Sequence, residues 1–224
     1  MSYDDDDDLD EFEYPYMPAL STALADPFEG TRTVDGWRIE RLGLIQGTCD
    51  HGTIYDPLGP EGGGFPMRPG GTPVYLVARE AAPGVPVAVL VHPGETVPVS
   101  TEDCGDRVAT PSGLAVIHAN PSTTWIEPGT GMLKRAWATL SARAAGGESW
   151  RLERLREMLQ DASVDPTDWP VEPAEGDFAN DWLMIPDEDG TGTVLGILAD
   201  PDGSNTTECL DAEGNTVAIL LTLD

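Results

Sequence analysis

After residue 31, short runs of β-branched and other apolar residues alternate with clusters of Pro and Gly. The clearest of these runs are Pro73–Arg79, Val85–His92 and Gly113–Ala119. Apolar runs with turn residues at both ends are typical of β-strands. The clusters Gly62–Gly64 and Pro69–Gly71 predict loops, because glycine adopts positive φ without steric cost. Short strands with short connections favour an antiparallel sheet or sandwich over residues 31–130.

The hydrophobic period changes to that of a helix between residues 131 and 160. One apolar stripe consists of Leu133, Ala136, Trp137, Leu140 and Ala144, and a second of Leu152, Leu155, Met158 and Leu159. Gly146 and Gly147 separate the two stripes. Apolar residues that recur every three or four positions line one face of a helix, so we predict two helices that pack on the sheet.

The last part of the chain returns to a β pattern. Residues 161–178 are rich in Pro, Asp and Glu and predict a linker. The runs that follow are Asn180–Ile185, Thr193–Leu198 and Thr216–Leu223. Asp187–Gly190 and Asp211–Gly214 are typical of tight turns, so residues 179–224 predict a C-terminal β-meander. The predicted fold class is therefore α+β, with residues 31–224 in one compact domain.

The charged residues are distributed unevenly, and the two ends of the chain are strongly acidic. Asp and Glu number 40 and Lys and Arg 12, for a formal net charge of −28. Residues 1–30 carry ten acids and no Lys or Arg, and the five adjacent aspartates Asp4–Asp8 predict a disordered, acidic tail. Residues 161–224 carry sixteen acids and again no Lys or Arg, whereas six of the cations lie between Lys134 and Arg156.

This charge limits the partners that the chain can bind. An acidic surface repels DNA, RNA and anionic membranes, because each phosphate contact needs a cation that displaces counterions. It attracts basic proteins from a distance. No run approaches the ~18 apolar residues of a membrane span, and the acidic N-terminus lacks the basic region of a secretory signal. Three cysteines do not make an even-numbered disulfide framework, so we expect a cytoplasmic protein.

Two sets of residues in the sequence are compared with known metal-binding patterns by their type and spacing. The candidate zinc ligands are Cys49, His51, His92, Cys104 and His118. No pair of them has the spacing of a zinc motif, so we expect no metal there. An imitation of a calcium-binding EF-hand loop consists of Asp200, Asp202, Ser204 and Asp211. Asn205 occupies the position that must be Gly for the sharp turn, so a solvated turn is the favoured interpretation.

Motifs for catalysis or cofactor binding are absent from the sequence. It contains no G-x-S-x-G elbow, no P-loop and no G-x-G-x-x-G, and we predict no cofactor. Ser112, before Gly113, is interpreted as a turn residue, and Cys104–Asp106 as a loop with no assigned base. Because catalytic triads assemble in space, a hydrolase with its site in the β-rich part stays open as an alternative.

Three short blocks resemble a known family. They are Gly47–Pro57, Arg68–Val77 and Leu210–Ala218, which carry an Asp-Pro step, a Pro-Val strand start and an Asp-x-x-Gly hairpin. Together they resemble the bacterial family called domain of unknown function 4241 (DUF4241), whose members have about this length. The chain departs from the family pattern at Thr110–Gly113 and Asp200–Gly203. The family has no established activity, so the resemblance implies none.

The uneven charge predicts a non-enzymatic interaction protein of bacterial or phage origin. Its partner would be basic, such as a toxin or a nucleic-acid-binding protein, and an immunity-type inhibitor is preferred because complementary charge speeds association. The candidate partner-binding residues are Asp4, Asp5, Asp6, Asp7, Asp8, Glu11, Glu13, Asp187, Glu188 and Asp189. The alternatives are the hydrolase and an acidic housekeeping protein whose charge reflects the composition of its host, a GC-rich or halophilic bacterium.

Overall fold

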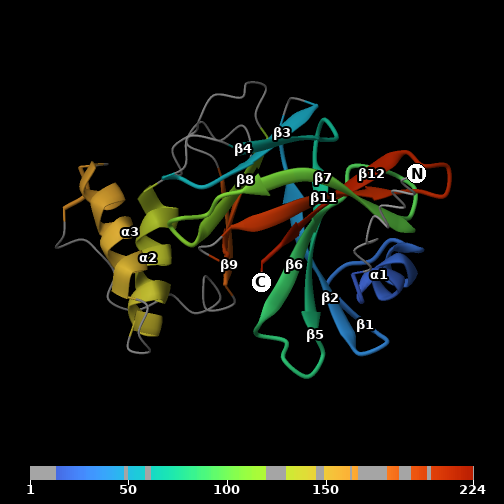
Figure 1. Cartoon of the computed structure of the whole chain (residues 1–224), viewed down its shortest axis with the longest axis horizontal. Helices are drawn as coiled ribbons and strands as arrows, with labels where there is room; N and C mark the ends of the chain where they lie inside the picture. The colour runs from blue at the N-terminus through green and yellow to red at the C-terminus, as the bar shows by residue number, and fades with distance from the viewer. Residues whose placement is uncertain are drawn as a thin grey trace, which may run out of the picture.

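Two antiparallel β-sheets stack face to face, with helices against both outer faces (Figure 1). The computed structural model describes residues 14–47, 50–58, 62–119, 130–144, 149–161, 163–165, 181–186, 193–200 and 203–223. Figure 1 shows the paired helices at one side of the sandwich and the N-terminal helix at the other. The predicted α+β class, with a mainly antiparallel sandwich, is confirmed.

The larger sheet has seven strands in the order β1-β2-β5-β6-β12-β11-β7. Their bounds are β1 Thr31–Val34, β2 Trp37–Ile45, β5 Thr72–Arg79, β6 Pro86–Val91, β7 Ser100–Val108, β11 Ser204–Leu210 and β12 Thr216–Thr222. Every neighbouring pair is antiparallel. The last strand of the chain, β12, inserts between β6 and β11, so the C-terminal segment completes the middle of the sheet.

The smaller sheet has five strands in the order β4-β3-β8-β10-β9. Their bounds are β3 His51–Tyr55, β4 Gly62–Pro66, β8 Leu114–Ala119, β9 Trp182–Pro186 and β10 Thr193–Leu198. The predicted C-terminal β-meander is thus two hairpins, β9–β10 in this sheet and β11–β12 in the larger one. Strands with two apolar faces must be buried on both sides. Because the two hairpins belong to different sheets of the sandwich, each can pack one face against the opposite sheet.

The core of the sandwich lies between the sheets, and each sheet is also buried on its outer face. Along β6, Val89 and Val91 point into the space between the sheets, whereas Ala88 and Leu90 join the cluster on the outer face. Strand β8 shows the same alternation between the inner core and the outer cluster beneath the paired helices. Burial on both faces explains why these strands are continuous apolar runs without alternating polar residues.

Helix α1, Met17–Leu24, covers the outer face of the larger sheet. Its buried side chains are Met17, Ala19, Leu20 and Ala23, which pack in one cluster with Tyr75, Val77 and Leu90. The prediction of a disordered tail over residues 1–30 is therefore wrong for its described part, residues 14–30. The run of aspartates dominated that prediction, although the apolar spacing after Tyr16 is that of a helix. Residues 1–13 lie outside the described part of the chain.

Helices α2, Thr130–Ala144, and α3, Ser149–Asp161, confirm the prediction of two helices over residues 131–160. Their apolar stripes form one cluster with the outer face of the smaller sheet. The approach is close at Gly196 on β10, where a Cβ would lie 2.5 Å from Sδ of the buried Met132 on α2. Most of the predicted linker, residues 161–178, lies outside the described residues. In the described ranges, no helix is long and apolar enough to cross a bilayer.

The predicted loop at Gly62–Gly64 is wrong, because these residues begin strand β4. Gly63 pairs with Ile54 and Gly64 with Thr53 on β3. Phe65, on the same strand, covers Gly52, where an added Cβ would lie 2.4 Å from the ring. A large side chain that packs over a glycine on the neighbouring strand stabilises a pairing that the glycines themselves do not favour.

The packing of α1 generates a stability prediction. Leu20→Ala should lower the free energy of unfolding by about 2–5 kcal/mol, because the fully buried side chain would leave a cavity beneath the helix. Thr22→Ala, at an exposed position of the same helix, should change it by less than about 0.5 kcal/mol. Urea denaturation followed by tryptophan fluorescence measures both variants. Equal midpoints for Leu20→Ala and the wild type would show that α1 is not part of the folded core.

Candidate functional site

The partner-binding residues predicted from the sequence lie outside the described part of the chain. They are Asp4, Asp5, Asp6, Asp7, Asp8, Glu11, Glu13, Asp187, Glu188 and Asp189. Their role therefore stays a prediction, and the candidate site consists of residues that the structure describes.

The three histidines are divided between the two sheets. His118 is buried on β8 opposite Thr53 of β3, so the exposed His51 lies diagonally across from it on the same face. His92 follows β6 in the other sheet. The ring of His51 pairs with Asp50 over 2.6 Å, and this hydrogen bond lowers the pKa of the Asp50 carboxyl. Cys49 is not described, and the described residues contain no group of three or more His, Cys, Asp or Glu that could hold a metal.

The residues that resemble a calcium-binding EF-hand loop do not form such a loop in the structure. Ser204 begins strand β11 and Asp211 directly follows its end, so the length of a strand separates them. Asp211 instead closes the β11–β12 turn, where its Oδ1 accepts the backbone N–H groups of Glu213 and Asn215. These hydrogen bonds, above all the one from Asn215, lower the pKa of the Asp211 carboxyl.

A buried carboxylate joins two segments that are far apart in the sequence. Asp56, which follows β3, is 0% exposed. Its Oδ2 accepts the Ser112 hydroxyl at 2.7 Å and the Ser112 N–H at 2.8 Å, and its Oδ1 accepts the N–H of Leu58 at 2.6 Å. Ser112 does lie in a turn, with Gly113 at φ +71°. The link to Asp56 was missed because no spacing rule connects positions 56 residues apart.

This Asp–Ser unit is suited to holding the fold together. Both side chains are 0% exposed, so a substrate has no access to the Ser112 hydroxyl. That hydroxyl donates to a carboxylate that already accepts two backbone N–H groups. A buried polar group fully provided with hydrogen bonds fixes the relative position of the segments that carry it.

A second polar network lies in the larger sheet, where the segment after β6 meets the β11–β12 turn. The Nε2–H of the buried His92 donates to the Thr96 carbonyl over 2.9 Å, and the Thr96 hydroxyl donates to Asp211 over 3.0 Å. Gly94 N–H donates to the Val217 carbonyl at 3.0 Å. Burial lowers the pKa of His92, because the charged imidazolium would lose solvation there. The segment between β6 and β7 is thereby held against the β11–β12 hairpin.

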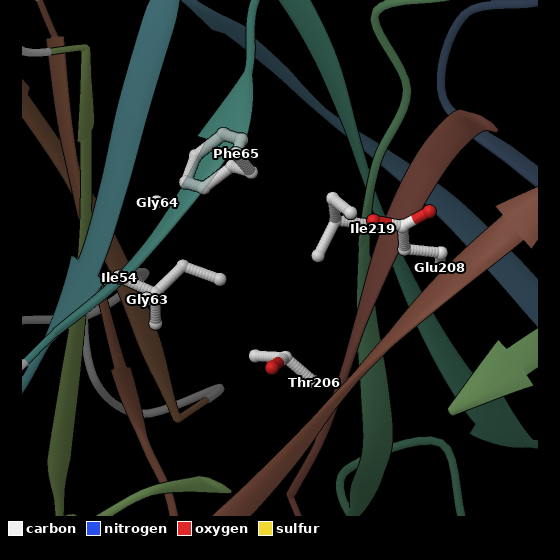
Figure 2. Close-up of a pocket in the computed structure, with 7 residues that line it drawn as sticks. All are labelled: Ile54, Gly63, Gly64, Phe65, Thr206, Glu208 and Ile219. Carbon is white, nitrogen blue, oxygen red and sulfur yellow. The ribbon is translucent and has the colours of Figure 1, made fainter. Parts of the chain in front are cut away.

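The sheets leave a small cavity between β3 and β4 on one side and β11 and β12 on the other (Figure 2). Its volume is about 40 Å³, and it is lined by Ile54, Gly63, Gly64, Phe65, Thr206, Glu208 and Ile219. Figure 2 shows Ile54 and Phe65 facing Thr206, Glu208 and Ile219 across the space. The walls are mainly apolar, and Glu208 supplies a charged group.

Glu208 is a half-buried carboxylate on the inward-facing side of β11. It lies opposite Ile219 of β12, a residue of the inter-sheet core, and opposite Glu102 of the edge strand β7. Directly opposed residues of antiparallel strands share a face with Cβ atoms about 5 Å apart, and like charges in such a pair repel. The one carboxylate in the cavity lining, Glu208, therefore has a second negative charge beside it on the edge strand.

One of the Glu208 oxygens is occupied within the hairpin. Its Oε2 accepts the Thr216 hydroxyl, and in the described residues no group donates to Oε1. An apolar cavity with a carboxylate in its wall suits a small cationic group. The pairing of Glu102 with Glu208 depends on strand register, which the sequence pattern did not contain because β11 was not predicted as a strand.

Comparisons of the chain with family models, curated proteins and solved structures found no match. The resemblance to domain of unknown function 4241 stays a prediction.

The Asp56–Ser112 unit generates a graded prediction of stability. Ser112→Ala should lower the free energy of unfolding by about 1–2 kcal/mol, because Asp56 keeps its two backbone donors. Asp56→Ala should cost about 3 kcal/mol or more, because it leaves buried donors without an acceptor. Ser100→Ala, at an exposed position, is the control. Chemical denaturation measures all three, and a neutral Asp56→Ala would contradict the structural role.

His92 generates a prediction of pH dependence. Its pKa is lowered in the folded state, so below its ordinary value of 6.5 the unfolded chain binds a proton that the folded chain does not. The free energy of unfolding should therefore fall as pH decreases below 6.5, by at most about 1.4 kcal/mol per pH unit from this group. His92→Gln, which can still donate to Thr96, should lose less stability than the wild type between pH 7.5 and 5.5 in thermal denaturation. Parallel curves for the two proteins would rule the effect out.

Proposed function

We propose that this chain is a non-enzymatic, acidic interaction protein that binds a basic protein partner in the cytoplasm. An immunity-type inhibitor of a toxin is the form of this function that we favour. The observation that carries the proposal is the use of the cations: the described arginines are engaged within the chain, so the acidic surplus is left on the surface.

Several arginines hold elements of the fold together. Arg32 donates to the Ala23 carbonyl at 2.6 Å and lies over the Phe28 ring, and Arg41 donates to the Phe28 carbonyl at 3.1 Å, so both bind the segment after α1 to the sheet. Arg143 forms an ion pair with the buried Asp181 ahead of β9.

Other arginines are committed in the same way. Arg79 lies 4.7 Å from the Trp37 ring centre and Arg156 5.3 Å from that of Trp137, in cation–π contacts. Ion pairs join Arg38 with Glu40, Arg68 with Glu95, and Arg154 with Glu157. These contacts leave little positive charge to neutralise the remaining acids.

Acidic side chains that form no ion pair with a described cation are exposed over several elements. They include Asp35, Glu80, Glu102, Glu153 and Glu213. A surface with such an excess attracts a basic protein over a distance of about a Debye length, near 10 Å at 0.1 M salt. Complementary charge raises the association rate, which is the property that an inhibitor of a toxin needs.

Titration against basic toxins tests the function. We expect at least one cationic toxin domain to bind with 1:1 stoichiometry in isothermal titration. The association rate should fall by about tenfold or more between 50 and 300 mM salt, because salt screens the electrostatic attraction between the two proteins. Neutral and acidic proteins of the same size are the controls. Heat without saturation, or an equal response from the acidic controls, would contradict the proposal and favour an acidity that only reflects the host.

A further inference from the structure

Resting on the function proposed above, we propose that the cavity between β4 and β11 receives a lysine side chain of the basic partner. Its ammonium group pairs with Glu208, and its methylene groups lie against Ile54, Phe65 and Ile219. The cavity thus sets which chemical group of the partner is recognised, whereas the surface charge sets only the attraction.

The size and lining of the cavity match this occupant. A volume of about 40 Å³ is far below the roughly 300–1,000 Å³ of sites for drug-sized ligands. It exceeds the ~10–15 Å³ that one water molecule needs, so it has room for an ammonium group. Lysine buries its methylene stem along apolar surface while its charged end stays with polar groups. A planar guanidinium group is larger, which favours lysine over arginine.

The charges around the cavity lack a cation. Glu208 faces Glu102 across the β7–β11 pair, and the Thr216 hydroxyl occupies only one oxygen of Glu208. A cation placed between the two carboxylates would convert their repulsion into attraction. In the described residues, no arginine or lysine forms an ion pair with either of them.

Gly63 on β4 keeps the cavity open although the backbone does not require a glycine there. Gly63 lies opposite Ile54, whose side chain points inward, so a side chain at position 63 would enter the space between the sheets. An added Cβ would be 3.8 Å from Val108, an ordinary contact, and Gly63 is not among the glycines with positive φ. Alanine would therefore be tolerated there, and its absence leaves the cavity unfilled.

A different role for Glu208 is the protection of an edge. Charges that point inward near an edge strand prevent edge-to-edge aggregation, and β7 is an edge strand. In that role Glu208 would need no ligand, and a water-filled cavity would show no preference for a cation. The two roles predict different responses to a lysine side chain.

The experiment uses the full chain labelled at the isoleucine δ1 methyl groups. NMR titrations compare the capped pentapeptide Gly-Gly-Lys-Gly-Gly with peptides in which norleucine or arginine replaces the lysine. We expect the lysine peptide to shift the Ile54 and Ile219 methyl signals, and Ile39, beneath α1, to stay unchanged. The norleucine peptide should cause no shift. A stronger response to the arginine peptide would overturn the choice of lysine.

Two pairs of variants separate the site from general charge. Glu208→Gln should weaken the lysine response by about tenfold, the loss expected for one charge-assisted hydrogen bond, whereas Glu213→Gln, an equal charge change at the exposed turn, should not. Gly63→Ala should abolish the response by filling the cavity, whereas Gly84→Ala, at an exposed position between β5 and β6 where an added Cβ meets no atom within 4 Å, should preserve it. Removing one of two opposed charges does not threaten folding, so Glu208→Gln is expected to fold.

The outcomes distinguish this proposal from the function on which it rests. If a basic toxin binds the wild type and Glu208→Gln equally, or if the lysine peptide leaves Ile54 and Ile219 unshifted, the cavity is not the recognition site and the general function stands. If the lysine peptide binds at the cavity but no basic protein binds the chain, the interaction function fails instead.

Discussion

The structure depends on burial of both faces of both sheets. Strands β5, β6, β8, β10 and β12 are apolar on both sides, so a single sheet with one exposed face would leave half of those side chains in water. The chain meets this requirement with four layers, α1 outside the larger sheet and α2 with α3 outside the smaller one. Helix α1 therefore belongs to the core as the inter-sheet residues do, because its buried side chains share one cluster with Tyr75, Val77 and Leu90.

The scarcity of cations makes their placement a second constraint. With 12 Lys and Arg against 40 acids, few cations are present both to join elements and to pair with acids at the surface. Arg32 and Arg41 are used where α1 meets the sheet, and Arg143 where α2 meets β9.

The parts of the fold that could be predicted from the sequence are those whose side chains follow a strand or a helix pattern. Strands β5, β6, β8, β10 and β12 are apolar runs, and α2 and α3 have helical period. Strand β4 begins with three glycines and β11 is largely polar, Ser204-Asn-Thr-Thr-Glu, so neither has a strand pattern. Both are strands because their neighbours supply the pairing: Phe65 packs over Gly52, and β11 lies between β7 and β12. The Asp56–Ser112 unit and the Glu102–Glu208 pair depend on long-range register that local patterns do not contain.

The residues that line the cavity come together only after strands β11 and β12 have paired. Ile54 and Phe65 come from the smaller sheet, and Thr206, Glu208 and Ile219 come from the last two strands of the larger one. Contacts of such high sequence separation form late, since long loops must close before the contacts stabilise them. Strand β12 must insert between β6 and β11 before Ile219 faces Ile54. A partner that recognises this cavity would bind the folded chain and not its partly folded forms, so binding there would stabilise the pairing of the two sheets as well.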